Sequence, residues 1–176
     1  SNLGSHLCDL GHEVHGNDNL LGGYDDNIDK RFIFSNVDCC NLEKLTEIIP
    51  KNTDIVYHCA ATAHEGLSVF SPSFVTKNIF EASVSTVTAS IRKKVKKFIF
   101  CSSMARYGDL HPPFVEDMIP KPVDPYGIAK VAAENVIKNL CETHEVDWTI
   151  LVPHNIVGPR QKYDDPFRNV MSIFLN

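Results

Sequence analysis

The chain has 176 residues, of which 43% are hydrophobic and 22% are charged, and its formal net charge is −5. This length and composition are ordinary for a soluble globular domain with one hydrophobic core. No apolar run is long enough to span a membrane and no signal peptide is recognisable, so we expect a cytoplasmic protein.

The first half of the chain predicts two helices and two strands. Residues 2–10 have a helical pattern that ends at Gly11, a residue that commonly terminates helices. Residues 13–16 and 31–37 are predicted as strands, and residues 42–49 as a helix that stops before Pro50.

The second half continues the alternation. Residues 54–60, 97–102 and 146–152 are predicted strands, and a long helix runs from Ser71-Pro72 to about Lys94. A proline-rich loop occupies residues 109–125, and a further helix begins with Asp124 and Pro125 and runs to about residue 144. Regular alternation of buried strands with helices is typical of a parallel sheet with helices on both faces, so we predict an open, doubly wound α/β fold.

Sheets of this kind bind ligands beyond the carboxyl ends of their strands. The residues that follow the five predicted strands are Asp18-Asn19, Asp38-Cys39, Ala60-Ala61, Ser102-Ser103 and Pro153-His154-Asn155. Asp18 is placed to accept hydrogen bonds from the hydroxyls of an adenosine ribose, and its charge would favour NAD over NADP. Ala60-Ala61 either lets the backbone approach a cofactor closely or simply packs a helix on the sheet. These strand ends outline a dinucleotide site.

Tyr126 and Lys130 are four residues apart near the start of the helix that begins at Asp124. That spacing puts both side chains on one helix face. A phenol has a pKa of about 10, so it must be acidified to act as a base near neutral pH. An ammonium one turn away and a positive nicotinamide ring would stabilise the phenolate. Ser103, at the end of a neighbouring strand, can hydrogen-bond the same substrate hydroxyl.

The six cysteines, at positions 8, 39, 40, 59, 101 and 141, form no C-x-x-C motif. Cys59 and Cys101 lie within predicted strands. We therefore expect buried thiols, with neither disulfides nor a structural zinc site.

Five segments together resemble the extended short-chain dehydrogenase/reductases. They are GHEVHGNDNL (11–20), VYHCAA (56–61), FIFCSSMARYG (98–108), DPYGIAKVAAE (124–134) and PHNIVGPRQ (153–161). Within that group the chain is most similar to the NAD-dependent epimerase/dehydratase family, and closest to its UDP-glucose 4-epimerases. The resemblance covers nearly the whole chain and implies a Rossmann-like fold with NAD as cofactor.

The resemblance also implies a role for each matched position. Ser103, Tyr126 and Lys130 would be the catalytic residues. The implied cofactor-binding residues are Asp18, Asn19, Asp38, Cys39, Ala60, Ala61, Asn78, Tyr126 and Lys130, and the implied substrate-binding residues are Ser103, Asn155 and Asn169; no metal is implied. The implied reaction is transient oxidation at C4 of a nucleotide sugar, with hydride transfer to bound NAD and return to the opposite face.

Both ends of the chain depart from the family pattern. The glycine-rich loop G-x-x-G-x-x-G and the first strand of the family are expected before Ser1, and the substrate domain is only beginning at the far end. We therefore expect an N-terminally truncated NAD-binding domain at 1–160, followed at 161–176 by the start of the substrate-binding region. By this reading the 176 residues alone are a fragment that does not turn over substrate.

Two further departures lie next to Ser103. The 4,6-dehydratases of the family carry Asp-Glu soon after the catalytic serine or threonine, whereas this chain has Met104-Ala105, and neither side chain can move a proton. This argues against a dehydratase. Arg106 replaces a residue that is usually small and apolar. It could reach a phosphate or carboxylate of the substrate, but we expect it at the surface or in a salt bridge.

We therefore predict an NAD-dependent nucleotide-sugar 4-epimerase, with a UDP-sugar as substrate. The alternatives are a UDP-glucuronate decarboxylase or another sugar-nucleotide oxidoreductase of the family and, in a different class, a non-catalytic NAD-binding scaffold. When full length, the enzyme is expected to form a homodimer by pairing helices 72–94 and 124–144. The basic run at 92–97 is expected to be a solvated helix end, so we predict no nucleic-acid or membrane partner.

Overall fold

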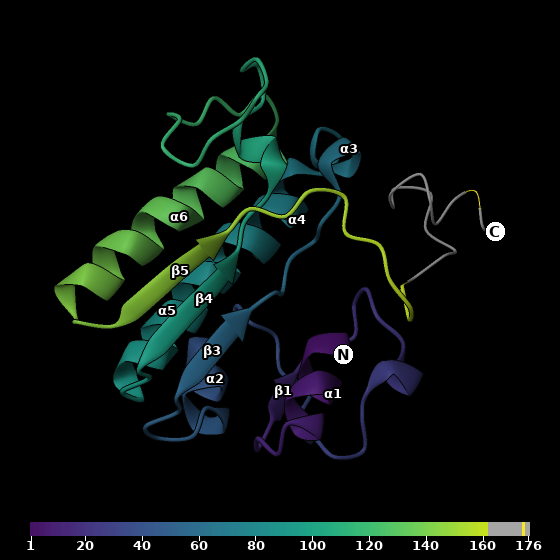
Figure 1. Cartoon of the computed structure of the whole chain (residues 1–176), viewed down its shortest axis with the longest axis vertical. Coiled ribbons are helices and arrows are strands. Elements are labelled where there is room, and N and C mark those ends of the chain that lie inside the picture. The colour runs from purple at the N-terminus through teal and green to yellow at the C-terminus, as the bar shows by residue number, and fades with distance from the viewer. Residues whose placement is uncertain (162–173, 175–176) are drawn as a thin grey trace. The chain divides into compact units, whose positions relative to one another are not determined.

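The computed structural model describes residues 1–161 and residue 174 (Figure 1). The chain divides into two compact units, the first made of residues 1–38 with those from 155 onward, and the second of residues 39–154. The predicted boundary at residue 160 stays a prediction.

The first unit contains a short parallel ladder and a helix. Helix α1 (Asn2–Asp9) is followed by β1 (His15–Asn17), a 3-10 turn η1 (Asp25–Asn27) and β2 (Ile33–Ser35). Strands β1 and β2 pair in parallel, with Gly16 opposite Phe34. The predicted helix and both predicted strands are present, although the strands are shorter than expected.

The second unit contains the larger sheet and most of the helices. Its elements are α2 (Leu42–Ile48), β3 (Ile55–His58), α3 (Glu65–Ser68), α4 (Pro72–Thr76), the π-helical turn η2 (Lys77–Glu81), α5 (Ala82–Arg92), β4 (Lys97–Cys101), the 3-10 turn η3 (Met104–Arg106), α6 (Pro125–Thr143) and β5 (Asp147–Leu151). The three strands are parallel in the order β3-β4-β5. Parallel strands alternating with helices confirm the predicted α/β class.

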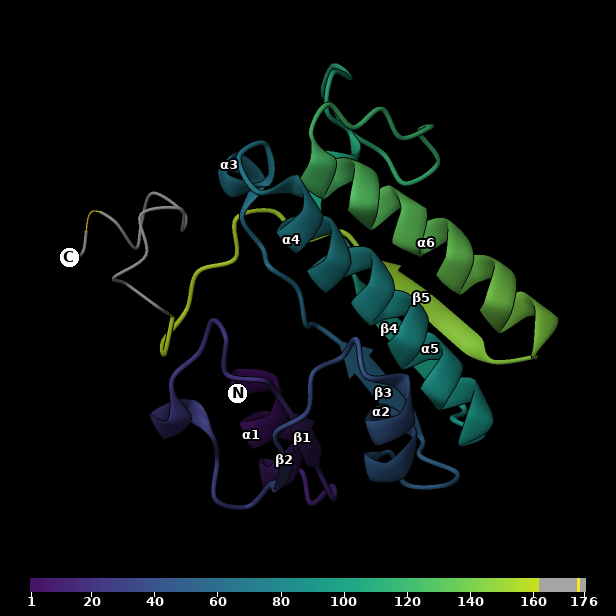
Figure 2. The same cartoon turned by 180° about the vertical axis from the view of Figure 1, so that it is seen from behind.

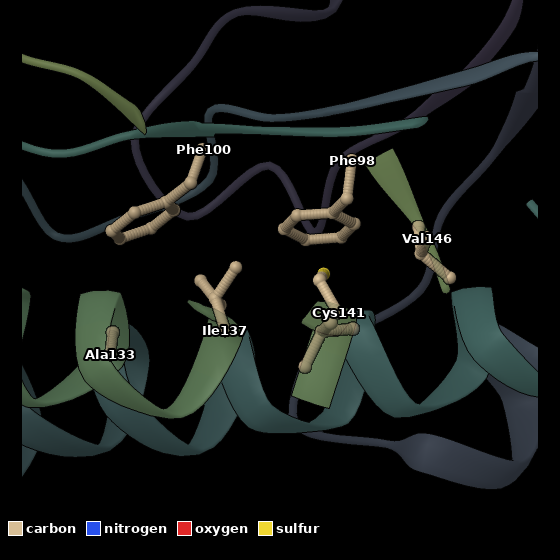
Figure 3. Close-up of a cluster of buried hydrophobic side chains, with 7 residues drawn as sticks. Phe98, Phe100, Ala133, Ile137, Cys141 and Val146 are labelled. Atoms are coloured by element: carbon tan, nitrogen blue, oxygen red, sulfur yellow. The ribbon is translucent and has the colours of Figure 1, made fainter. Parts of the chain in front are cut away.

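Aromatic residues of β4 build the core of the second unit. Phe98 and Phe100 are fully buried and point from the central strand toward Ile137 and Cys141 of α6 (Figure 3). Helices α5 and α6 lie side by side over this face of the sheet (Figure 2). Because alternate residues of a strand face opposite sides, Ile99 and Cys101 point away from this core.

The helix predicted from residue 72 to about 94 is not uniform. It runs as α4 and α5 joined by the π-helical turn η2, and it ends at Arg92. The π turn is a single turn between two α-helical segments, so the stretch as a whole still has the pattern of one continuous helix. The short helix α3 lies in a stretch for which no helix was predicted.

Candidate active site

Helix α6 begins at the point that the sequence predicts. The Asp124 carboxylate accepts a hydrogen bond of 2.9 Å from the backbone N–H of Gly127, and Pro125 occupies the first turn. Asp124 therefore caps the helix, and the cap fixes where its first turn presents Tyr126.

Tyr126 and Lys130 lie on one face of α6, and both are buried. The side chain of Tyr126 packs with Val75, Ile79 and Ala129, and only 8% of the residue is exposed. Lys130 is 3% exposed, and its Nζ lies 5.9 Å from the centre of the Tyr126 ring. The sequence placed this pair at the edge of the buried stripe; the structure places it inside.

The ammonium of Lys130 is held under the carboxyl end of β4. Its Nζ donates a hydrogen bond of 2.7 Å to the carbonyl oxygen of Cys101 and lies 4.9 Å from the centre of the Phe100 ring. A carbonyl oxygen and an aromatic face both favour a cation, so these contacts offset part of the cost of burying the charge.

Ser103 joins the pair from the loop after β4. It is the N-cap of η3, where its Oγ accepts a hydrogen bond of 3.2 Å from the backbone N–H of Ala105. The Ser103 side chain is also close enough to Tyr126 to lower the pKa of the phenol through hydrogen bonding. The structure therefore brings Ser103, Tyr126 and Lys130 together at the carboxyl end of the sheet.

A glycine allows α6 to approach η3 closely enough for this contact. A Cβ atom added to Gly127 would lie 2.8 Å from the carbonyl oxygen of Ala105 and 3.0 Å from Cβ of Pro122. Since the first of these atoms belongs to the backbone, it could not swing aside. The absence of a side chain next to Tyr126 thus sets the distance between the two segments.

Burial shifts the pKa values of the two proton-active groups in opposite directions. The pKa of Tyr126 is raised, mainly by burial, and the hydrogen bond from Ser103 offsets only part of that effect. Burial lowers the pKa of Lys130 to about 8. The expected acidification of Tyr126 is therefore not achieved by the protein groups alone, because removing water from a phenolate costs more than the hydrogen bond restores.

Sequence reasoning missed a buried ion pair that supports this loop. Arg106, which is 6% exposed, forms a salt bridge of 3.2 Å with Glu134 of α6. Glu134 is 1% exposed and also accepts a hydrogen bond from the Ser102 hydroxyl. Of the two places expected for Arg106, the surface is wrong and the salt bridge is confirmed. A signal was available, because Glu134 follows Lys130 by four residues and so lies on the same helix face.

The other residues predicted for the second unit are spread along it. Ala60 is exposed after β3, whereas Ala61 packs against the cluster around Tyr126, which supports helix–sheet packing for Ala61. Asn78 lies in η2, where its Nδ2 donates a hydrogen bond of 2.9 Å to the carbonyl oxygen of Phe74. Cys39 is partly buried at the start of the unit.

Asp18 and Asn19 follow β1 in the first unit and are exposed. The carboxylate of Asp18 accepts a hydrogen bond of 2.8 Å from the N–H of Leu20. The amide oxygen of Asn19 accepts one of 3.2 Å from the N–H of Leu21. Asp18 lines a pocket whose wall also includes Gly16, Asn17, Tyr24 and Phe34. A carboxylate at the rim of a pocket beyond a strand end suits the predicted ribose contact.

The structure says little about three of the residues predicted to bind cofactor or substrate. Asp38 and Asn155 are exposed and belong to the first unit. Asn169 lies outside the described residues.

A parallel α/β fold with polar side chains gathered beyond its strand ends defines a Rossmann-like domain of the nucleotide-binding class. The profile of the NAD-dependent epimerase/dehydratase family matches residues 1–176. The chain belongs to this family, as its motifs predicted.

Solved structures of 4-epimerases share this fold. The UDP-glucose 4-epimerase of Thermotoga maritima, solved with UDP-glucose, is 30% identical with a TM-score of 0.89, and the match covers 97% of this chain and 56% of that one. The UDP-glucose 4-epimerase of Thermus thermophilus, solved with NAD, is 28% identical with a TM-score of 0.83, and the match covers 92% and 53%. The family is NAD-dependent, and its solved members include complexes with that cofactor.

Curated relatives include more than one type of sugar-nucleotide enzyme. The UDP-glucose 4-epimerase of Mycolicibacterium smegmatis is 29% identical over 171 residues, which cover 90% of this chain and 54% of the relative. A human dTDP-D-glucose 4,6-dehydratase is 34% identical over 110 residues, which cover 61% and 31%. The chain thus spans about half the length of the solved enzymes and of the Mycolicibacterium smegmatis relative. Its match covers about a third of the human relative.

Among residues 1–161 and 174, no helix combines the length and the apolar character needed to cross a bilayer.

Proposed function

We propose that the chain is the cofactor-binding part of an NAD-dependent nucleotide-sugar 4-epimerase that acts on UDP-sugars. The observation that carries this proposal is the contact set of Ser103, Tyr126 and Lys130 at the carboxyl end of β4. The similarity to 4-epimerases over most of the chain supports the same reaction.

The residues present suit NAD. Lys130 and Tyr126 offer donors beside the strand ends, where a nicotinamide ribose would present its hydroxyls. Asp18 offers an acceptor for the adenosine ribose from the first unit. Asp38, Cys39, Ala60, Ala61 and Asn78 are proposed to line the rest of the cofactor's path, together with Asn19. Bound NAD would supply the hydride acceptor and a positive charge near the phenol.

Each of the three side chains has a distinct task in this proposal. Tyr126 removes the proton from the 4-hydroxyl of the sugar and later returns it. Ser103 hydrogen-bonds that hydroxyl and the phenol, which keeps the two oxygens in line for proton transfer. Lys130, whose pKa of about 8 leaves it mostly charged near neutral pH, stabilises the phenolate by charge. Asn155 and Asn169 are proposed to contact the sugar nucleotide.

The loop next to Ser103 favours epimerisation over elimination of water. Met104 and Ala105 carry no titratable group, and Arg106 is engaged with Glu134. In this loop no side chain is therefore available to remove a second proton from the sugar. A UDP-glucuronate decarboxylase or another oxidoreductase of the family remains the alternative among enzymes, and a non-catalytic NAD-binding scaffold remains the alternative among other classes.

We further propose a cytoplasmic homodimer that pairs α4–α5 and α6, on which Phe74 and Ile128 are exposed. The 176 residues by themselves are proposed to lack turnover. Epimerase activity from these residues alone would contradict that proposal.

The test uses the protein expressed from its full gene. It is incubated with a panel of UDP-hexoses and UDP-pentoses, with dTDP- and GDP-sugars as comparisons, and the products are identified by NMR. We expect interconversion of one pair of C4 epimers without net consumption of NAD. Binding of NAD with no conversion of any sugar would instead support the scaffold, and release of carbon dioxide from UDP-glucuronate would support the decarboxylase.

A further inference from the structure

Two cysteines meet at the carboxyl ends of neighbouring strands. In the parallel pairing of β3 with β4, His58 lies opposite Phe100, and Cys59 and Cys101 are the residues that follow these two in the chain. Their Sγ atoms are 3.5 Å apart and share a hydrogen bond. Cys59 is exposed and Cys101 is partly buried, which corrects the expectation that both thiols are buried.

The usual spacing of neighbouring strands is compatible with a disulfide between them. Adjacent strands lie about 4.8 Å apart. Disulfide-linked residues have Cα atoms roughly 4.4–6.8 Å apart. Closing the gap between the two sulfur atoms therefore requires side-chain rotation, and no large movement of the backbone.

The two thiols also differ in a way that suits exchange chemistry. The hydrogen bond from Cys59 lowers the pKa of Cys101 to about 7, and the nearby charge of Lys130 contributes. The lowered pKa of Cys101 favours its thiolate, which is the form that attacks a disulfide. The same hydrogen bond raises the pKa of Cys59, which favours its protonated form.

We propose that Cys59 and Cys101 are a redox-active pair that forms a reversible intramolecular disulfide by exchange with a low-molecular-weight disulfide such as oxidised glutathione. The Cys101 thiolate attacks one glutathione sulfur, which forms a mixed disulfide and releases one glutathione thiolate. That thiolate takes the proton of Cys59, whose sulfur then attacks the sulfur of Cys101 and expels the second glutathione, which is protonated by the solvent. The protein loses two electrons, and the glutathione disulfide gains them.

The pair is placed to influence Lys130. The carbonyl oxygen of Cys101 is the acceptor for the Lys130 ammonium, and the negative charge of the Cys101 thiolate supports that ammonium. Oxidation removes the negative charge of the Cys101 thiolate and rotates the Cys101 side chain. We therefore expect the disulfide to lower turnover, an effect that rests on the function proposed above.

The disulfide is tested by peptide mapping of the native full-length protein. The protein is equilibrated with oxidised glutathione, its remaining thiols are alkylated, and it is digested with trypsin without reduction. Cys59 and Cys101 fall in separate tryptic peptides, 52–77 and 98–106, and each peptide contains one cysteine. We expect the two peptides to be linked after oxidation and separate again after treatment with dithiothreitol.

Cysteine-to-serine variants show which two thiols form the disulfide. Cys59→Ser and Cys101→Ser should each abolish the link, whereas Cys8→Ser, a change in the first unit, should keep it. Recovery of both peptides alkylated, or only a lasting glutathione adduct on one of them, would overturn the proposal. Should Cys101→Ser fail to fold, Cys59→Ser alone decides, because its exposed side chain can be replaced with little loss of packing.

Activity is a separate readout. The oxidised enzyme should lose roughly tenfold or more of its activity, since small shifts of a catalytic group have effects of this size, and dithiothreitol should restore it. Unchanged activity in a protein shown to contain the disulfide would refute the proposed effect of the disulfide on Lys130. If the reduced protein converts no nucleotide sugar, the proposed function fails, and the peptide map still decides whether the disulfide forms.

Discussion

The ammonium of Lys130 donates a 2.7 Å hydrogen bond to the carbonyl oxygen of Cys101, which joins the first turns of α6 to the end of β4. The contact lies beside the buried Tyr126 ring and at the base of the Cys59–Cys101 pair. The lysine that would assist the catalytic phenol is therefore anchored by the residue that carries one of the two neighbouring thiols.

Lys130→Met should change how stability depends on pH. The pKa of Lys130 is about 8 in the folded protein, below its ordinary value of 10.5. Between these values the unfolded chain binds more protons than the folded one, so the free energy of unfolding rises with pH as this group titrates. Below pH 8 the lysine is protonated in both states, and the full cost of burying its charge applies.

The measurement is urea unfolding of the wild type and the variant from pH 7 to pH 10. We expect Lys130→Met to be the more stable of the two at pH 7, with an advantage that shrinks toward pH 10. Lys138→Met, which replaces a less buried lysine on the same helix, is the matched control. A constant difference between Lys130→Met and the wild type would contradict the lowered pKa.

Tyr126→Phe should remove activity and leave the fold and cofactor binding intact. The substitution keeps the ring that packs with Val75 and Ile79 but deletes the only group proposed to move the substrate proton. Loss of a general base typically costs about 10²–10⁴-fold in rate. Turnover is followed by NMR, and bound NAD is measured after denaturation. Full activity in this variant would exclude the proposed base.

The Arg106–Glu134 ion pair should show strong coupling in a double-mutant cycle. Removing one partner leaves a buried charge without its counter-ion, which costs about 3–5 kcal/mol. Arg106→Met and Glu134→Gln should each be strongly destabilising in urea, and the double variant should cost less than the sum of the two. Additive effects would mean that the two side chains do not stabilise each other.

Gly127→Ala should destabilise the protein although alanine is the better helix former. Its gain in helix propensity is about 1 kcal/mol, and crowding in a packed site costs about 1–3 kcal/mol. Crowding should prevail because the nearest obstacle is the backbone oxygen of Ala105, 2.8 Å away. The control is Gly23→Ala, where no heavy atom lies within 4 Å of the added carbon. Equal stability of both variants would show that α6 does not depend on this close approach.

Local rules accounted for much of the fold and for the central part of the site. The Asp124 cap, the first turn at Pro125 and the shared face of Tyr126 and Lys130 all follow from the order of residues within one helix. The strand ends were also predictable, because strands alternate with helices along the chain and Ser103 lies two residues after the end of the apolar strand β4.

Features that depend on contacts between distant segments were not predicted. Arg106 and Glu134 are 28 residues apart, and the position of Glu134 on the helix face of Lys130 does not show which residue of another segment will pair with it. The π turn at Lys77–Glu81 was hidden within a stretch that reads as an ordinary helix. The thiols of Cys59 and Cys101 meet only because β3 and β4 pair in one particular register.

The order of residues by itself determined the family and the parallel α/β class and singled out Ser103, Tyr126 and Lys130 as candidates, because these depend on motifs, periodicity and capping within short segments. Tertiary structure alone decided the electrostatic state of that set. Burial by α4, η2 and β4 raises the pKa of Tyr126 and lowers that of Lys130, since desolvation depends on which atoms displace water around a group.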